Sequence, residues 1–288
     1  MGSAAFSSLY LPAVLIVIMF GIGLALEKKD FENVILYPRA ILIGLVAQMV
    51  LLPAIAFLLV FFTSLPPIVK VGFILIASCP GGSSSNLVAH LLRGNVALCI
   101  SLTALNSILI LFTLPLIVNL GLLAFIGETH EIQLPLSETI LKIFYTTLIP
   151  TFAGVYIRHM NLNLAMKMEK PLRVIMTVLL FSVFATLIIS EEQNTGEGVS
   201  RYTYLFPYAI TLNLVAMAAG YFFSRKMGLD NRNNYTISIQ VGLQNSALAI
   251  FVANSLLGNR EMTMVAVVYS SFTFFSTLLF GYLAKRFG

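Results

Sequence analysis

Two short stretches of this chain place polar side chains inside segments that are otherwise apolar enough to cross a membrane. The first reads Cys-Pro-Gly-Gly-Ser-Ser-Ser-Asn, from Cys79 to Asn86. The second reads Gln-Val-Gly-Leu-Gln-Asn-Ser, from Gln240 to Ser246. Hydroxyl, amide and carbonyl oxygens are hard ligands that an alkali cation accepts, and they also hydrogen-bond a polar organic solute. The two stretches therefore predict a binding site for a small ion or a polar solute.

Both stretches are expected to interrupt a helix. Pro80 lacks the N–H that a helix needs, and two glycines follow it. Backbone that is not helical persists inside a membrane only where protein or a water-filled cavity satisfies its polar groups. The exposed N–H groups at such a break suit an anion, and the exposed carbonyls suit a cation. Paired interruptions of this kind are the best sequence indication of a transporter site between inverted repeats.

The alternative interpretation of polar residues in membrane helices is packing between helices. We adopt it for isolated residues such as Ser182 and Thr211, and we expect Asn106 and Asn213 to make packing hydrogen bonds. For the dense clusters that coincide with the breaks, the binding interpretation is favoured.

The sequence gives little support to an enzyme. An intramembrane serine hydrolase needs a histidine base in the cavity of its serine. The nearest candidate, His90, lies about one to two turns beyond the serines. We find no phosphate-binding loop, dinucleotide fingerprint or zinc-type spacing. No Asp or Glu lies at the centre of an apolar segment, which argues against a proton relay. We therefore expect a protein that is not an enzyme.

The composition is that of an integral membrane protein. Of the 288 residues, 58% are hydrophobic and 10% are charged, whereas soluble domains carry about a quarter charged residues. A spanning helix needs roughly 20 apolar residues. The sequence predicts an all-α polytopic membrane protein with about nine such segments, near 7–26, 36–62, 67–92, 95–121, 136–158, 171–190, 202–224, 233–258 and 262–284.

The basic residues predict the orientation. Thirteen of the 17 Lys and Arg residues fall on one side of the predicted bundle and four on the other. Cytoplasmic loops carry the excess of basic residues, so we expect the N-terminus outside and the C-terminus in the cytoplasm, in a plasma (inner) membrane. Because the basic residues lie in short loops, we expect no nucleic-acid partner, and no obligate protein partner is evident. The minority side has Lys70, Lys142, Arg201 and Arg260.

These motifs resemble the bile acid:sodium symporter (BASS) family. The run from Cys79 through Ile108 resembles the first broken helix of that family and the sequence that follows it, and Val-Gly-Leu-Gln-Asn-Ser-Ala resembles the second. The resemblance implies a panel domain of residues 7–26 and 134–190 and a core domain of residues 33–121 and 200–286. The core would hold the two broken helices, near 67–92 and 233–258. Substrate would bind between the two domains, and the core would shift against the panel to alternate access.

The resemblance also implies two sites for sodium ions and a substrate site. The first sodium site would use Ser85, Asn86, Cys99, Thr103 and Gln240. The second would use Gln48, Gln244 and the backbone carbonyls of Gln240, Val241 and Leu243, with the side chain of Gln240 nearby. The substrate site would include Ser83, Ser84, Asn245 and Thr273.

Two positions of the first sodium site depart from the family pattern. Members that couple to sodium usually carry Glu at the position of Gln240 and a hydroxyl residue at that of Cys99. A carboxylate supplies a full charge in a low-dielectric site, and a thiol is a poor ligand for a hard cation. The sequence therefore predicts weak or absent sodium binding at the first site. It leaves open a sodium-coupled transporter with altered ligands and a sodium-independent carrier or exporter on the same fold.

The predicted cavity suits a small amphipathic organic anion. Bacterial relatives commonly carry Trp-His-Asn on the last helix, where this chain has Phe272, Thr273 and Phe274. That wall should therefore be more apolar, while Ser83 and Asn245 remain to hold a carboxylate or a hydroxyl group.

Overall fold

Seven long helical segments make up most of the chain. The computed structural model describes residues 6–30, 32, 38–127, 135–196 and 198–287, and seven of its helices are long and apolar enough to cross a membrane. Several are interrupted by a π-helical turn, and one begins as a 3₁₀ helix. The segments are η1 with α2 (Phe6–Tyr10, Leu11–Ala25), α4 with η2 and α5 (Pro38–Val46, Ala47–Leu51, Leu52–Phe61), α8 (Val96–Phe125), α9 with η3 and α10 (Leu136–Ile143, Phe144–Leu148, Ile149–Met160), α11 (Leu162–Thr195), η4 with α12 (Gly198–Leu205, Phe206–Lys226) and α15 (Arg260–Phe287).

Two further segments are broken in the middle, as expected. The first consists of α6 (Pro67–Ser78) and α7 (Ser83–Leu91), and the second of α13 (Asn231–Gly242) followed by α14 and η5 (Ser246–Phe251, Val252–Leu256). Each half is too short to span a bilayer alone. The all-α polytopic class is confirmed, whereas the number of nine spans stays a prediction.

The predicted boundaries of the sixth segment, 171–190, are wrong. Helix α11 runs from Leu162 to Thr195, so its first turns carry basic residues that the sequence placed in a loop. The helix begins directly after α10 because the side chain of Asn161 caps it, accepting a hydrogen bond from the backbone N–H of Leu164 at 2.9 Å. It ends at Gly196, whose φ of 70° is the left-handed conformation common after helices.

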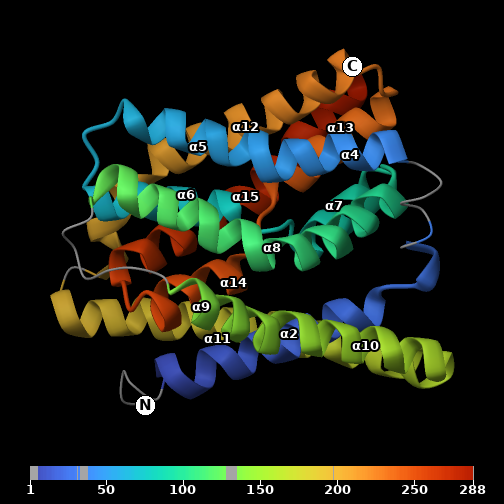
Figure 1. Cartoon of the computed structure of the whole chain (residues 1–288), viewed down its shortest axis with the longest axis horizontal. Helices are drawn as coiled ribbons and strands as arrows, with labels where there is room; N and C mark the ends of the chain where they lie inside the picture. Colours follow the sequence, from blue (N-terminus) through green and yellow to red (C-terminus); the bar gives the residue numbers. More distant parts are fainter. Residues whose placement is uncertain (1–5, 31, 33–37, 128–134, 197, 288) are drawn as a thin grey trace.

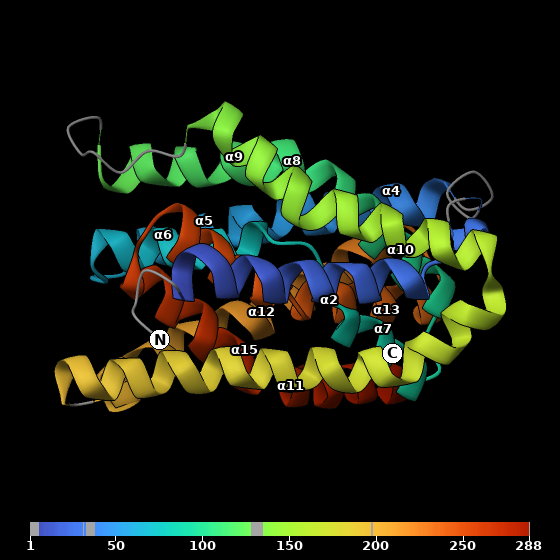
Figure 2. The ribbon, with the colours of Figure 1, turned by 90° about the horizontal axis from the view of Figure 1, so that it is seen from below.

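Helices α2, α10 and α11 pack on one another along one side of the molecule (Figures 1 and 2), with α9 leading into α10. The contact between α2 and α10 is the most extensive of the fold. It depends on two glycines, because an added Cβ at Gly23 would lie 2.0 Å from the carbonyl oxygen of Thr151, and one at Gly154 would lie 2.4 Å from that of Phe20. Such small residues let membrane helices approach closely.

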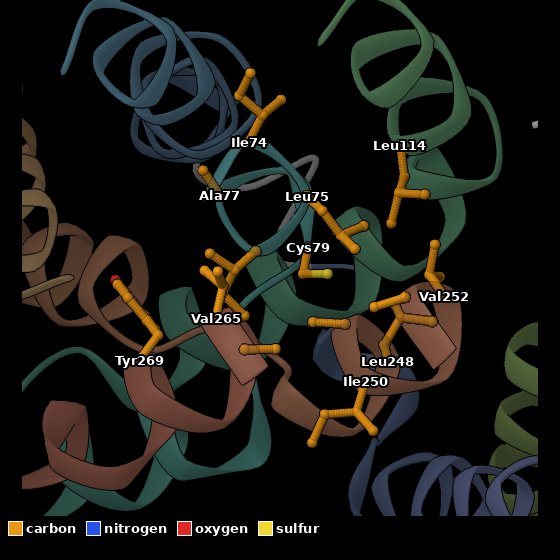
Figure 3. Close-up of a cluster of buried hydrophobic side chains, with 14 of the residues drawn as sticks. Ile74, Leu75, Ala77, Cys79, Leu114, Leu248, Ile250, Val252, Val265 and Tyr269 are labelled. Carbon is orange, nitrogen blue, oxygen red and sulfur yellow. The ribbon is translucent and has the colours of Figure 1, made fainter. Parts of the chain in front are cut away.

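The other helices form a second group around α6, which packs against α5, α8 and α15, while α12 packs against α13 and α15. Figure 3 shows the apolar cluster at its centre, where Leu75 and Cys79 of the first broken segment lie near Leu114 of α8 and Leu248 of α14. Both cysteines of the chain are buried and free. We call the first group, α2, α9, α10 and α11, the panel helices and the second group the core helices. The division of the chain into a panel and a core domain, and the motion of the two as separate units, stay predictions.

A charged cluster ties the panel helices together at one end. Arg158 of α10 contacts Glu27 after α2 at 2.6 Å and Glu169 of α11 at 3.6 Å. Hydrogen bonds from Lys29 and then Arg158 hold the pKa of Glu27 below its ordinary value, and burial raises the pKa of the neighbouring Asp30. We call this end of the bundle, which also holds the C-terminal turns of α12 and α15, the basic end. The end that holds Arg260 is called the opposite end.

We predict that Gly23→Val destabilises the panel helices. The new side chain would collide with the backbone of α10, and overpacking of this kind costs about 1–3 kcal/mol or more. The melting temperature of the purified protein measures the effect. Ala25→Val is the matched control, because Ala25 is exposed on the same helix and its variant should melt close to the wild type. Equal melting temperatures for the two variants would contradict the account.

Candidate functional site

The two broken segments cross and satisfy each other's backbone. The N–H of Gly82 donates to the carbonyl of Leu243 at 3.1 Å, and the N–H of Asn245 donates to the carbonyl of Pro80 at 2.8 Å. Gly81 and Gln244 thus form an isolated antiparallel β-bridge in the part of the chain that the structure describes. Because an unpaired backbone group in a membrane costs several kcal/mol, this pairing explains how both helices can stop inside the protein.

Gly81 also makes room for the side chain of Gln240. An added Cβ at Gly81 would lie 2.2 Å from Nε2 of Gln240, whereas one at Gly82 would be 3.3 Å from its nearest neighbour. The first glycine of the motif is therefore needed for close approach and not only for the break in the helix.

Four of the five residues predicted for the first sodium site are hydrogen-bonded to one another. The Oε1 atom of Gln240 accepts from the Ser85 hydroxyl at 2.7 Å and from the Cys99 thiol at 3.1 Å. Its Nε2 donates to Oγ1 of Thr103 at 3.1 Å. All four side chains are buried. The fifth residue, Asn86, has a buried Oδ1 for which the described residues supply no partner.

The amide of Gln240 hydrogen-bonds three other side chains of the first predicted sodium site. It supplies an acceptor to Ser85 and Cys99 and a donor to Thr103, so these three side chains are paired with it without a cation, and only the buried Oδ1 of Asn86 in this site lacks a partner among the described residues. A carboxylate in the same place could only accept, and its charge would need a buried counter-ion. The geometry therefore gives a physical basis for weak sodium binding at the first site.

The residues of the second predicted sodium site form a chain of hydrogen bonds. The π-helical turn η2 carries Gln48, whose Nε2 donates to Oε1 of Gln244 at 2.7 Å and to the carbonyl of Cys79 at 3.0 Å. The Nε2 of Gln244 donates to the carbonyl of Val241 at 2.6 Å. The carbonyl of Leu243 is paired across the crossing. The Oε1 of Gln48 is buried and has no partner among the described residues.

The residues predicted for substrate lie on both sides of the crossing. Ser83 and Ser84 are exposed in the first turn of α7, where Ser85 points inward. Asn245 is buried and caps α14 by accepting from the backbone N–H of Leu248 at 3.1 Å. Thr273 is buried on α15, and no interaction joins its side chain to the other three within the structure as described.

Sequence reasoning expected Asn213 to make a packing hydrogen bond but did not place it beside the crossing. Asn213 of α12 donates from Nδ2 to the carbonyl of Gly242 at 2.8 Å and to the hydroxyl of Tyr269 at 3.2 Å. Its Oδ1 accepts from Ser276 at 2.6 Å, and Tyr269 reaches the same carbonyl of Gly242 at 3.3 Å. These contacts fix the end of α13. A lone Asn in an apolar helix was the available signal, and the expected packing hydrogen bond is confirmed for Asn213.

The same expectation is wrong for Asn106. Its side chain is 1% exposed, and neither of its polar atoms has a hydrogen-bond partner in the described part of the chain. The sequence could not separate the two residues, because both are single amides in apolar helices and only the neighbouring helix decides what each one meets.

An all-α membrane bundle whose two broken helices cross at a cluster of buried oxygens is the architecture of a membrane transporter. Comparison with known sequences agrees, because the model of the Sodium Bile acid symporter family matches residues 12–196. The chain therefore belongs to that family, and the protein is a transporter and not an enzyme.

Individual relatives are similar over most of this chain. The "Uncharacterized sodium-dependent transporter YocS" of Bacillus subtilis (strain 168) is 28% identical over 86% of this chain and 74% of its own length. The "Probable sodium/metabolite cotransporter BASS1, chloroplastic" of Arabidopsis thaliana is 29% identical over 89% of this chain. The "Sodium/bile acid cotransporter 4" of Mus musculus is 27% identical over 98%. The chain spans 62% of the length of the plant relative and 64% of the length of the mouse relative.

We predict that Gln240→Glu strengthens sodium binding at the first site. The carboxylate would replace the Nε2 donor with charge, and Ser85 and Thr103 would then face an anion that favours a bound cation. Isothermal titration of the purified protein with NaCl, with choline chloride as the blank, should show an added binding event that is at least tenfold tighter than any sodium binding at this site in the wild type.

Asn233→Asp is the matched control for charge. It adds the same charge to α13 but in the first turn of that helix, where Asn233 pairs with Asn95, so it should leave sodium binding unchanged. Wild-type binding at the first site as tight as that of Gln240→Glu would contradict the account.

Proposed function

We propose that the protein is a secondary carrier of a small amphipathic organic anion, coupled to one sodium ion at the second site. Membership of a sodium symporter family supports sodium coupling in general. The observation that carries the finer proposal is the contrast between the two sites. In the first site the amide of Gln240 already pairs with Ser85 and Thr103, whereas in the second site the buried Oε1 of Gln48 has no hydrogen-bond partner among the described residues.

The substrate class follows from the groups beside the crossing. Ser83 and Ser84 expose hydroxyls at the N-terminus of α7, where free backbone N–H groups favour an anion. On α15, Phe272 is half-buried and Phe275 is exposed, so the wall that the substrate would meet there is apolar. A carboxylate on an apolar body matches both features.

We propose alternating access as the mechanism, with the present conformation closed at the opposite end. There Glu191 of α11, 1% exposed, forms an ion pair with Arg260 of α15 and accepts from the hydroxyl of Tyr202 at 3.2 Å. This contact links a panel helix to a core helix, and α2 also packs against α14. Toward the basic end, exposed side chains of α7 include Ser83, Ser84, Leu87, His90 and Leu91.

The protein is integral to a membrane, and the orientation follows from charge. We propose that the basic end faces the cytoplasm, because loops on that side carry excess Lys and Arg, and that the membrane is a plasma (inner) membrane. The N-terminus would then lie outside and the C-terminus inside. In this orientation the conformation described above is open to the cytoplasm.

Transport in proteoliposomes tests the proposed function. Counterflow of labelled carboxylates should be saturable, and replacing sodium with potassium on both sides should reduce the rate at least tenfold. A sodium-independent carrier on the same fold is the second candidate. It is favoured by the hydrogen bonds that pair Gln240 with Ser85 and Cys99 without a cation. Equal rates in sodium and potassium would establish that candidate and reject the first, and conductance without added substrate would reject both.

We predict that Glu191→Gln opens the opposite end, which faces the outside in the proposed orientation. Loss of the buried charge weakens the pair with Arg260, and removing one partner of a buried pair is strongly destabilising to the contact. The reporter is Ser84→Cys, which a membrane-impermeant maleimide should label several-fold faster from outside when Glu191→Gln is also present. The two native thiols are buried and give little background.

Glu192→Gln is the matched control, because Glu192 is the exposed neighbour on the same helix. Labelling of Ser84→Cys should be the same with and without it. No difference between the Glu191→Gln and Glu192→Gln backgrounds would contradict the role of the ion pair in closing the outer side.

A further inference from the structure

Asn106 has hydrogen-bonding capacity that the packing of the described residues leaves unused. It lies in the middle of α8 with 1% of its surface exposed, and no described residue bonds to its Oδ1 or its Nδ2. Asn213 is equally buried, yet its amide donates to Gly242 and Tyr269 and accepts from Ser276. A buried amide without partners destabilises a folded protein, and native structures contain few of them. We therefore expect Asn106 to bind a ligand.

The side chain of Asn106 follows the stripe of α8 that faces the broken end of α13. Residues three, four and seven apart share one face of a helix. Cys99 and Thr103 on this stripe both contact the side chain of Gln240. Asn106 comes three residues after Thr103, so it is the next side chain along the same face, about one turn nearer the opposite end.

The neighbouring segment brings Gln48 to the same level. The first turns of α4 and α8 line one cavity, and further along an added Cβ at Gly44 would lie 2.6 Å from Cδ1 of Leu102. Later residues of α4 thus lie beside later residues of α8, so the two helices run in the same direction. Four more residues along each helix lead to Gln48, in the π-helical turn η2, and to Asn106, so we expect the two side chains to lie on either side of the crossing at a similar depth.

Buried oxygens without hydrogen-bond partners in the predicted ion sites and at Asn106 point to a cation. The Oε1 of Gln48, the Oδ1 of Asn86 and the Oδ1 of Asn106 are all buried acceptors to which none of the described residues donates. Amide and carbonyl oxygens are the ligands of hard cations. We infer that Asn106 supplies its Oδ1, together with Oε1 of Gln48, to the sodium ion of the second site. This inference rests on the proposed sodium coupling and adds a ligand to it.

The test measures sodium affinity in the purified full-length chain. Melting temperature is followed against NaCl, with choline chloride keeping the ionic strength constant, because a ligand that binds the native state stabilises it by RT ln(1 + [L]/Kd), so the sodium concentration at which the temperature begins to rise reports the affinity. Asn106→Leu should weaken sodium binding at least tenfold and melt no lower than the wild type in the absence of sodium. Asn106→Asp should tighten it, since the new carboxylate adds charge to the same oxygen position.

Ser107→Ala and Gln48→Leu complete the set. The hydroxyl of Ser107 is already bonded to the Thr103 carbonyl of its own helix at 2.8 Å, so its loss should leave sodium binding unchanged, whereas Gln48→Leu should abolish it. Sodium binding that disappears in Gln48→Leu but is unchanged in Asn106→Leu would overturn the role of Asn106 alone. A wild type without any sodium-specific shift would overturn the proposed sodium coupling as well.

Discussion

The structure depends on one constraint, which is that backbone polar groups inside a bilayer must find partners within the protein. Most of the chain meets it with continuous helices. At the crossing, where both helices stop, the free N–H of Gly82 and the free carbonyl of Leu243 belong to different segments and satisfy each other. Neither break is stable without the other, so the two polar motifs, more than 150 residues apart in sequence, form a single structural unit.

The crossing also fixes the positions of the side chains that surround it. Gln240 lies in the last turn of α13, and its side chain reaches Ser85 and Thr103. The carbonyl of the next residue, Val241, accepts from Gln244, which in turn accepts from Gln48. Asn213 and Tyr269 hold the carbonyl of Gly242 from the far side. A displacement of the core that kept these contacts would carry both predicted ion sites as one body.

The two polar motifs were sufficient to predict both broken helices, because Pro, Gly and clustered amides rarely occur together in an apolar segment that is an unbroken helix. The breaks at Pro80 and near Gly242 followed from residue type alone, whereas the grouping of Cys99 and Thr103 with Gln240 followed from the resemblance to the family. What could not be predicted depends on contacts across helices. Asn106 and Asn213 look the same in sequence and differ entirely in their surroundings. The early start of α11 depends on a single cap at Asn161, in a stretch whose basic residues resemble a loop.

An amide at position 240 changes what the empty carrier can do. A carboxylate there would be a buried charge whenever the ion leaves, and an unpaired buried charge is strongly destabilising. The core would then be held in the conformation in which water or an ion reaches it. With Gln240 the empty cluster is neutral, and the amide is hydrogen-bonded to Ser85, Cys99 and Thr103. The electrostatic penalty for moving the empty core past the panel is therefore small. In the proposed mechanism the coupled cation is bound by the unpaired oxygens of Gln48 and Asn106.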